Sequence, residues 1–363
     1  FCYKMPRTFT ARVASGLRGG QIEIRLDSVA GKLLGTLNVS GTGGWEKWQT
    51  LTADLDAFDS YPELLHTRDL YLVFKGRKGP KLFNFDWWEI RGLEQVNMPL
   101  FQTKYTADPS PLVVGDTLFL YTSHDASPED IPDENEKGSA GFFMYDWLLW
   151  STTDMVNWTE HGAVASLKDF PWRSRENGAW AIQTVERNGK YYLYAPLHGH
   201  GIGVLVADSP YGPFKDPLGK PLVWDQSNWF DIDPSVYTDD DGQAYMYWGN
   251  PHTFWAKLGS DMTSLTSGVT KLPHIPNYQE GPWFYMRNGH YYLGFASTCC
   301  PEALGYAMSD SPTGPWEWKG YIMKPTHRDR GNHPGICDYK GHSYVFGQSY
   351  DLMHLDTYVH HER

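Results

Sequence analysis

The chain has 363 residues, enough for two domains with separate hydrophobic cores. Its 16 Trp, 23 Tyr and 17 Phe suit β-sheets and stacking on sugar rings, and its formal charge of −12 argues against nucleic acid or an anionic membrane as a partner while allowing a neutral polysaccharide. No stretch approaches the roughly 20 apolar residues of a membrane-spanning helix, and the chain opens without a signal peptide.

Residues 1 to 93 form the first predicted domain, a β-sandwich. Short runs in which apolar and polar residues alternate lie between Gly-rich turns, a pattern typical of two packed antiparallel sheets. The runs are 7–14, 21–26, 32–39, 48–51, 69–74 and 83–90.

Several segments of this domain resemble the family 6 carbohydrate-binding modules. Arg-Val-Ala-Ser-Gly, Ile-Glu-Ile-Arg-Leu-Asp-Ser, Thr-Gly-Gly-Trp45 and Phe-Asn84-Phe-Asp-Trp-Trp stand in that family's order. The resemblance covers the later part of such a module without its opening strands. It implies a jelly-roll-like fold and a site in which Trp45 stacks on a sugar and Asn84 hydrogen-bonds to it. By its residues alone, Trp45 in its Gly-rich turn is equally compatible with packing inside the domain.

Residues 97 to 363 carry a repeat. A turn glycine followed by an aromatic-rich run occurs five times, at spacings of 74, 53, 47 and 52 residues. The glycines are Gly115, Gly189, Gly242, Gly289 and Gly341. A period near fifty residues built from strand pairs predicts one propeller blade per repeat. We therefore expect an all-β chain in which a five-bladed β-propeller follows the sandwich.

Three acidic residues share one kind of context in this repeat. Asp108 stands in Thr-Ala-Asp-Pro-Ser-Pro, Asp233 in Ile-Asp-Pro-Ser-Val-Tyr and Glu280 in Gln-Glu-Gly-Pro-Trp-Phe. Each precedes a proline by one or two residues and opens the first strand of a blade. Because these strands converge on the axis of a propeller, the three carboxyl groups should share one pocket. An isolated Asp-Pro more often merely begins a strand.

The set of three favours glycoside hydrolysis. That reaction needs one protonated carboxyl group to protonate the leaving oxygen and one ionised group to activate water or attack carbon. The constellation resembles glycoside hydrolase family 43, from Asn97 to the end of the chain. The resemblance implies an inverting mechanism with Asp108 as the base and Glu280 as the acid. It makes Asp233 an ionised neighbour that keeps the acid protonated by repulsion between like charges.

The expected substrate is plant cell-wall hemicellulose, and the chemistry requires no cofactor. We expect an exo-acting α-L-arabinofuranosidase that removes arabinofuranose from arabinoxylan, outside the cell or in the periplasm. The alternatives are a β-xylosidase, an endo-arabinanase, and a carbohydrate-binding propeller without activity. Retention of all three acids in their motifs argues against the last, because binding alone does not require a protonated Glu beside two Asp.

Further matches to the family extend the predicted pocket. His124 and Asp125 follow a strand of the first blade and would lie at the edge of the site. Trp180, in Gly-Ala-Trp-Ala-Ile-Gln, would form a sugar-facing wall or pack in the core. His333, in Gly-Asn-His-Pro-Gly, matches the family's histidine near the axis, where some members place a calcium or a water-bound cation. A structural calcium at His333 is one reading; a hydrogen-bonded core histidine is the other.

The end of the chain departs from the family. Residues 358–363 stop where members continue through a basic residue into the strand that closes the propeller. Together with the absent front of the binding module, this predicts a permuted, truncated or incompletely represented protein.

Overall fold

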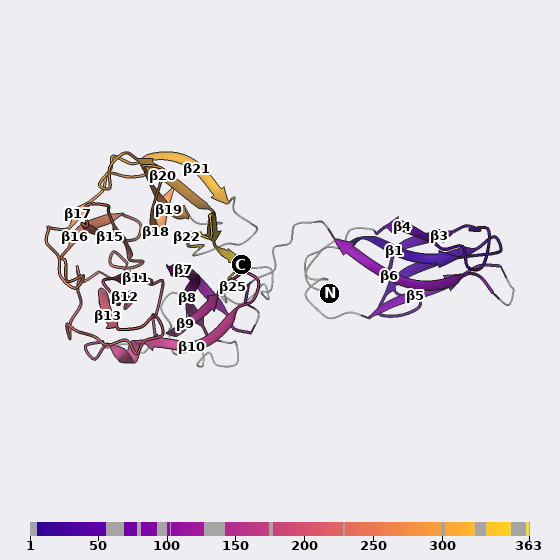
Figure 1. Ribbon diagram of the computed structural model, residues 1–363, viewed down its shortest axis with the longest axis horizontal. Helices are drawn as coiled ribbons and strands as arrows, with labels where there is room; N and C mark the ends of the chain where they lie inside the picture. The colour runs from indigo at the N-terminus through magenta and orange to yellow at the C-terminus, as the bar shows by residue number, and fades with distance from the viewer. Residues whose placement is uncertain are drawn as a thin grey trace. The chain divides into compact units, whose positions relative to one another are not determined.

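The structure is a computed structural model that describes residues 6–55, 69–77, 81–92, 100–101, 103–126, 142–173, 177–227, 229–298, 302–323, 332–349 and 361–362. These residues are almost entirely in strands and turns, and one 3-10 turn, η3 (Leu167–Asp169), is the only helical element among them. The chain divides into two compact units, Phe1–Met98 and Pro99–Arg363 (Figure 1). No helix in the described part is long and apolar enough to cross a membrane.

The first unit is a sandwich of two three-stranded antiparallel sheets. Its strands are β1 (Pro6–Ala14), β2 (Gly20–Leu26), β3 (Leu33–Val39), β4 (Gln49–Asp54), β5 (Leu70–Lys75) and β6 (Asn84–Gly92). One sheet has the order β4-β1-β6 and the other β3-β2-β5. Alternate residues of β1, such as Phe9 and Ala11, pack with Ile22 and Ile24 of β2 in a fully buried core. Each predicted run of alternating residues overlaps one of these strands.

The second unit is a ring of five antiparallel sheets (Figure 1). The first blade contains β7 (Thr106–Val114), β8 (Thr117–Asp125), β9 (Met144–Thr152) and β10 (Thr159–Ser166), and the second β11 (Gln183–Arg187), β12 (Lys190–Pro196) and β13 (Ile202–Ala207). The third contains β14 (Ser235–Thr238), β15 (Ala244–Trp248), β16 (Phe254–Leu258) and β17 (Thr270–Lys271), and the fourth β18 (Tyr278–Arg287), β19 (His290–Ser297), β20 (Leu304–Ser309) and β21 (Glu317–Met323). The fifth contains β22 (Gly335–Tyr339) and β23 (His342–Phe346), and a short pair, β24 (Gln348–Ser349) and β25 (His361–Glu362), follows it.

The repeat seen in the sequence is the hairpin between the first two strands of each blade. All five turn glycines lie between such strands; Gly242, for example, joins β14 to β15 with φ 83°, a conformation that costs glycine nothing. The predicted fold class, a β-sandwich followed by a five-bladed β-propeller, is confirmed.

Tyrosine hydroxyl groups fasten neighbouring blades to one another. Tyr121 of the first blade donates to the backbone oxygen of Pro210 beyond the second blade's β13, at 2.6 Å. Tyr339 of the fifth blade donates to the backbone oxygen of Asp116 in the first, at 2.8 Å. A buried tyrosine normally finds such a partner for its hydroxyl group. The second of these bonds joins the last repeat to the first, which fixes the inner strands around one axis.

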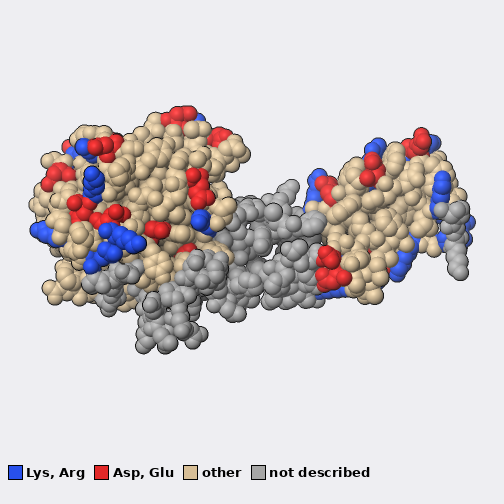
Figure 2. Space-filling view, turned by 90° about the horizontal axis from the view of Figure 1, so that it is seen from below, with Lys and Arg blue, Asp and Glu red and all other residues tan. Residues whose placement is uncertain are grey.

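Charged side chains on the face of the molecule drawn in Figure 2 stand in small groups of mixed sign, separated by wide areas that are neither acidic nor basic. The net charge of −12 is therefore not gathered into one continuous acidic area on the described part of that face. A surface of this kind suits a neutral ligand better than a polyion.

Candidate active site

A pocket lies where the inner strands of all five blades begin. It is lined by one short segment from each blade: Asp108-Pro109, Ala181-Ile182, Asp233-Pro234, Gly281-Pro282-Trp283 and His333-Pro334. Four of these segments end in or contain a proline, so stiff backbone frames most of the opening. As predicted, the ring brings residues from distant repeats together in one pocket.

The two aspartates share an unusual backbone conformation. Asp108 has φ 55° and Asp233 has φ 57°, in the left-handed region that few residues other than glycine adopt. Gly281 holds the same place in the fourth blade, with φ 59°. At Asp108 and beside Gly281 the pairing with the second strand slips, as in a β-bulge. Such irregularities re-aim a side chain, and here they accompany side chains that face the axis.

The acid of the fourth blade precedes this position by one residue, for a steric reason. A Cβ atom on Gly281 would lie 2.6 Å from Cδ2 of His333, far inside normal contact distance. Only glycine therefore fits at 281, and the carboxyl group comes from Glu280. This explains the Glu-Gly-Pro sequence where the other two blades have Asp-Pro.

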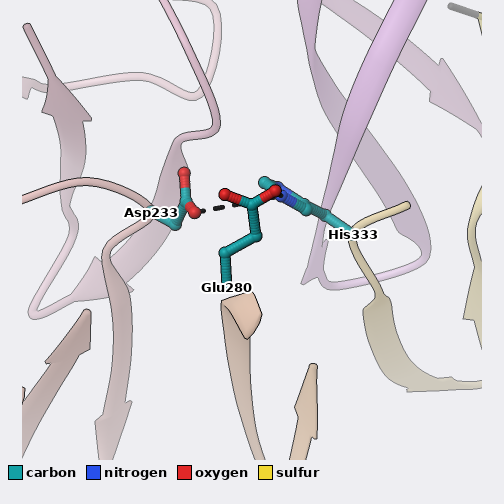
Figure 3. Close-up of side chains that lie close together, drawn as sticks. All are labelled: Asp233, Glu280 and His333. Carbon is teal, nitrogen blue, oxygen red and sulfur yellow. Dashed lines mark ion pairs between the residues drawn. The ribbon is translucent and has the colours of Figure 1, made fainter. Parts of the chain in front are cut away.

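His333 lies at the centre of the three carboxyl groups. Its Nδ1 is 3.0 Å from Oδ1 of Asp108, and its Nε2 is 3.8 Å from Oδ2 of Asp233 and 3.9 Å from Oε1 of Glu280. Figure 3 shows the side chains of Asp233, Glu280 and His333 approaching one another from separate segments of the ring. All four groups are largely withdrawn from solvent, with at most 16% of any side chain exposed.

The imidazole is held as a cation. Burial by itself lowers the pKa of His333, but the carboxyl groups of Asp233 and Asp108 outweigh burial, and the pKa lies well above its usual value. The site thus contains its own positive charge, placed between acids that would otherwise repel one another.

Asp233 differs from the ionised neighbour that the sequence predicted. Its pKa is raised to about 8, mainly by complete burial; His333 and the Gly281 N–H lower it, and the neighbouring Glu280 and Asp108 raise it. Repulsion between like charges acts on both partners, and the more deeply buried one also loses hydration. Burial therefore favours the protonated form of the Asp233 carboxyl group, rather than a fixed anion beside the acid.

Hydrogen bonds fix each carboxyl group. The Ser123 hydroxyl group donates to Oδ2 of Asp108 at 2.6 Å, and the Gly281 N–H donates to Oδ2 of Asp233 at 3.1 Å. Glu280 accepts a short bond at Oε2 from the side-chain amide of Asn250. Ser123 and Asn250 were not identified from the sequence. No local pattern marks them, because each belongs to a second strand or to the turn after one.

The separation of Asp108 and Glu280 has an upper limit. They face opposite nitrogens of one imidazole ring, at 3.0 and 3.9 Å, so these two carboxylate oxygens are at most about 9 Å apart, compared with about 6.5–9.5 Å between the carboxyl groups of inverting glycosidases. This limit excludes an arrangement in which the acid and the base lie at opposite ends of the propeller.

Two other predicted residues lie outside the lining of this pocket. The Nδ1 atom of His124, on β8, is 2.7 Å from Oδ1 of Asp146 on β9. Asp125 is 3% exposed. His124 pairs across the ladder with Thr106, two residues before Asp108, so it is near the acids in the strand register without reaching their pocket.

Trp180 is largely buried and belongs to an aromatic stack. Its ring lies 4.1 Å from that of His198 and 5.6 Å from that of Trp229, in near-parallel orientation, and it directly precedes the pocket-lining Ala181. Trp180 thus packs as a core residue beside the pocket. Trp229, with 42% of its surface exposed, presents an open ring four residues before Asp233. The sequence reading missed Trp229, although an aromatic pair before Asp-Ile-Asp was a usable signal.

In the sandwich, Trp45 and Asn84 lie side by side. The amide nitrogen of Asn84 donates to the backbone oxygen of Trp45 at 2.6 Å and so ties the Gly-rich turn to β6. The indole of Trp45 packs closely on Gly16, and the ammonium group of Lys81 lies 5.6 Å from the ring centre. The two residues are together, as the resemblance implied, and the bond between them is structural. Sugar binding at Trp45 stays a prediction.

Comparison with known families and proteins gives a consistent result. The model of glycosyl hydrolases family 43 matches residues 97–358, and the model of carbohydrate binding module family 6 matches residues 3–92. An arabinoxylan arabinofuranohydrolase of Paenibacillus polymyxa is 32% identical over 326 residues, which are 73% of this chain and 50% of the relative. The chain therefore spans about half the length of that relative.

Solved structures are similar as well. An α-L-arabinofuranosidase from Clostridium thermocellum is 36% identical with a TM-score of 0.58, over 69% of this chain and 85% of the other. A β-xylosidase/α-arabinofuranosidase from a compost metagenome, solved with xylotriose in a calcium-free form, is 28% identical with a TM-score of 0.63, over 73% and 92% of the two chains.

Proposed function

The chain belongs to glycosyl hydrolases family 43, and from this membership we propose that it is an inverting α-L-arabinofuranosidase acting on arabinoxylan. The observation that carries the proposal is the convergence of Asp108, Asp233 and Glu280 around His333 in one pocket on the propeller axis. Burying charged groups costs free energy, and sugar binding alone does not require three carboxyl groups around a buried imidazole. Such clusters are typical of catalytic sites.

In the proposed reaction, Asp108 acts as the base. Its carboxylate removes a proton from a water molecule, whose oxygen attacks the anomeric carbon from the face opposite the leaving group. Glu280 gives its proton to the glycosidic oxygen as the bond from carbon to that oxygen breaks. The Ser123 hydroxyl group and His333 contact Asp108 at 2.6 and 3.0 Å, and both favour its ionised form.

Asp233 and His333 set the charge balance of the pocket. The imidazolium compensates Asp108 at one nitrogen and faces Asp233 and Glu280 at the other. Because burial is the main reason that the pKa of Asp233 is raised to about 8, its carboxyl group favours the protonated form at neutral pH and adds little negative charge beside Glu280. The modulating role of Asp233 thus depends on the protonation state of its own carboxyl group.

A structural calcium at His333 would need ligands beyond the side chains present. Asp233, Glu280 and His333 offer ligand atoms within 4.8 Å of one another, but calcium takes about six to eight oxygen ligands and this set has two carboxylates and one imidazole. We expect dialysis against EDTA to leave the rate unchanged.

The exposed ring of Trp229 supports a polymeric substrate. Sugar rings stack on aromatic faces, and this one stands close to the pocket entrance through its contact with Trp180. A polysaccharide partner also suits the family 6 module at residues 3–92 and an extracellular or periplasmic location. β-Xylosidase activity is the second candidate, since the similar compost enzyme carries both names.

The stereochemical outcome tests the proposal. The chain is incubated with 4-nitrophenyl α-L-arabinofuranoside, and proton NMR follows the first sugar released. Inversion predicts β-L-arabinose first, before mutarotation. If the α-anomer appears first, the enzyme retains configuration and the assignment of Asp108 as a base is wrong. A panel of aryl xyloside, arabinoxylan and linear arabinan run in parallel separates arabinofuranosidase from xylosidase and endo-arabinanase.

Leaving-group dependence tests the roles. Glu280→Ala should slow substrates with poor leaving groups far more than activated aryl glycosides, because only the former need a proton in the transition state. Asp108→Ala should slow both alike, since nothing then activates water. Equal sensitivity of the two variants would mean that the acid has been misassigned.

A further inference from the structure

The two oxygens of Glu280 have different surroundings. Oε2 accepts a hydrogen bond from Nδ2 of Asn250, in the turn that follows β15 of the neighbouring blade. Oε1 faces Nε2 of His333 at 3.9 Å, beyond hydrogen-bonding distance. One oxygen is thus fixed by the protein, and the other, beside the pocket-lining His333, is left for a reaction partner.

The orientation of the Asn250 amide is fixed by a second residue. Nε2 of Gln279 donates to Oδ1 of Asn250 at 3.0 Å. A side-chain amide has one accepting end and one donating end, so a donor from Gln279 turns the Asn250 nitrogen toward Glu280. Gln279 and Glu280 are consecutive on β18, and the side-chain amide of Asn250, from the preceding blade, bridges their side chains.

The backbone around Asn250 is anchored on the same strand. The buried hydroxyl group of Tyr278, at the start of β18, donates to the backbone oxygen of Gly249 at 2.7 Å. The Gly249 N–H donates in turn to the backbone oxygen of Ile232, next to Asp233, at 2.9 Å. The backbone directly before Asn250 is therefore held by two hydrogen bonds, which limits the movement of the turn that carries its amide.

This arrangement determines where a proton can sit. A protonated carboxyl group has one hydroxyl oxygen and one carbonyl oxygen, and an N–H group can donate only to an oxygen that does not carry the proton in its direction. We propose that Asn250, oriented by Gln279, is a positioning residue that keeps the acidic proton of Glu280 on Oε1, toward the leaving oxygen of the substrate. This inference rests on the proposed role of Glu280 as the acid.

Without the amide, the proton has equivalent positions on both oxygens and the carboxyl group can rotate about its terminal bond. Part of the enzyme then holds the proton on the oxygen that faces away from the substrate. The loss concerns the proton-transfer step alone, so it should depend on the leaving group and leave substrate binding intact.

Two variants test this from different sides. Asn250→Ala removes the donor. Gln279→Glu leaves Asn250 in place but replaces the donor that faces Oδ1 of Asn250 with a carboxylate, which can only accept. This favours the flipped amide of Asn250, in which the amide oxygen faces Glu280. Asn157→Ala is the matched control, because Nδ2 of Asn157 also donates to a carboxylate, that of Asp154, at 2.7 Å in an exposed turn.

We expect both variants to lower kcat on arabinoxylan oligosaccharides about tenfold, the value of one well-placed hydrogen bond, with KM within about twofold. On 4-nitrophenyl α-L-arabinofuranoside, whose leaving group needs no proton, kcat should change by less than about twofold. Asn157→Ala should match the unchanged enzyme on both substrates.

The outcomes are distinguishable from failure of the proposed function. If Glu280→Ala itself shows no leaving-group dependence, Glu280 is not the acid, and both its proposed role and the positioning role of Asn250 are refuted. If Glu280→Ala shows it but both variants slow the two substrates equally, or slow neither, the positioning role is refuted alone. Should Asn250→Ala not fold, as judged by near-ultraviolet circular dichroism, Gln279→Glu decides the question.

Discussion

The positive charge at the centre of the pocket can be removed with little change of shape. His333→Asn keeps an amide group near the place of Nδ1, beside Asp108, but this group cannot carry a charge. Because the carboxyl groups then lose a neighbouring cation, each holds its proton more tightly. Both the ionisation of the base and the loss of the acid's proton should move to higher pH.

The size of this effect follows from the distances. Unit charges about 4 Å apart interact with about 4 kcal/mol at an effective dielectric constant of about 20. Nε2 of His333 is 3.8 Å from Asp233 and 3.9 Å from Glu280, and Nδ1 is closer still to Asp108. At about 1.4 kcal/mol per pKa unit, each loss corresponds to about three pH units before solvent and neighbouring groups rearrange. We expect a displacement of at least about one unit to survive that rearrangement.

The assay is the pH dependence of kcat/KM on 4-nitrophenyl α-L-arabinofuranoside. Both limbs of the profile should move upward together in His333→Asn. His290→Asn is the control, since His290 is an exposed histidine paired with Asp310 at 3.3 Å, and it should leave the profile in place. A profile that is lower but stays within about 0.3 pH units of the original would refute the reasoning, because structural damage alone lowers the height without displacing the limbs.

Three further predictions concern stability, packing and substrate length. The folded pKa values of Asp233 and His333 are raised, so the stabilisation they give is complete below their unfolded values and is lost as the pH rises through the folded ones. For Asp233 this loss extends from about pH 4 to about pH 8, and His333 adds to it above about pH 6.5, so the unfolding midpoint in calorimetry should fall as the pH rises toward about 8; a flat midpoint would contradict the raised values. Gly281→Ala should lower kcat/KM at least about tenfold by displacing His333, whereas Gly268→Ala, with open space around it, should not; equal activity would show that the contact relaxes freely. Trp229→Ala should raise KM about tenfold on arabinoxylan oligosaccharides and leave the aryl glycoside unchanged in steady-state kinetics, and a parallel rise on both would argue for a structural role.

The sequence by itself determined the architecture and which acidic residues lie together in the pocket. Turn glycines such as Gly242 and the alternation of aromatic residues after them are local features, since they reflect the backbone angles of a hairpin and the two faces of a strand. The Asp-Pro pairs at Asp108 and Asp233 are equally local, and once the repeat had predicted a propeller, symmetry about its axis was enough to bring them together.

Only the tertiary structure decided how these groups behave. The pKa of Asp233 depends on complete burial and on neighbours from three other blades, and sequence spacing contains neither quantity. His333 could be read as a metal ligand or a core residue until the distances placed it as a cation among acids. The bond from Asn250 to Glu280 crosses between blades, so it exists only because the ring sets a turn of one blade beside the first strand of its neighbour. Local pattern fixes backbone conformation, whereas charge and proton position depend on distances that only packing defines.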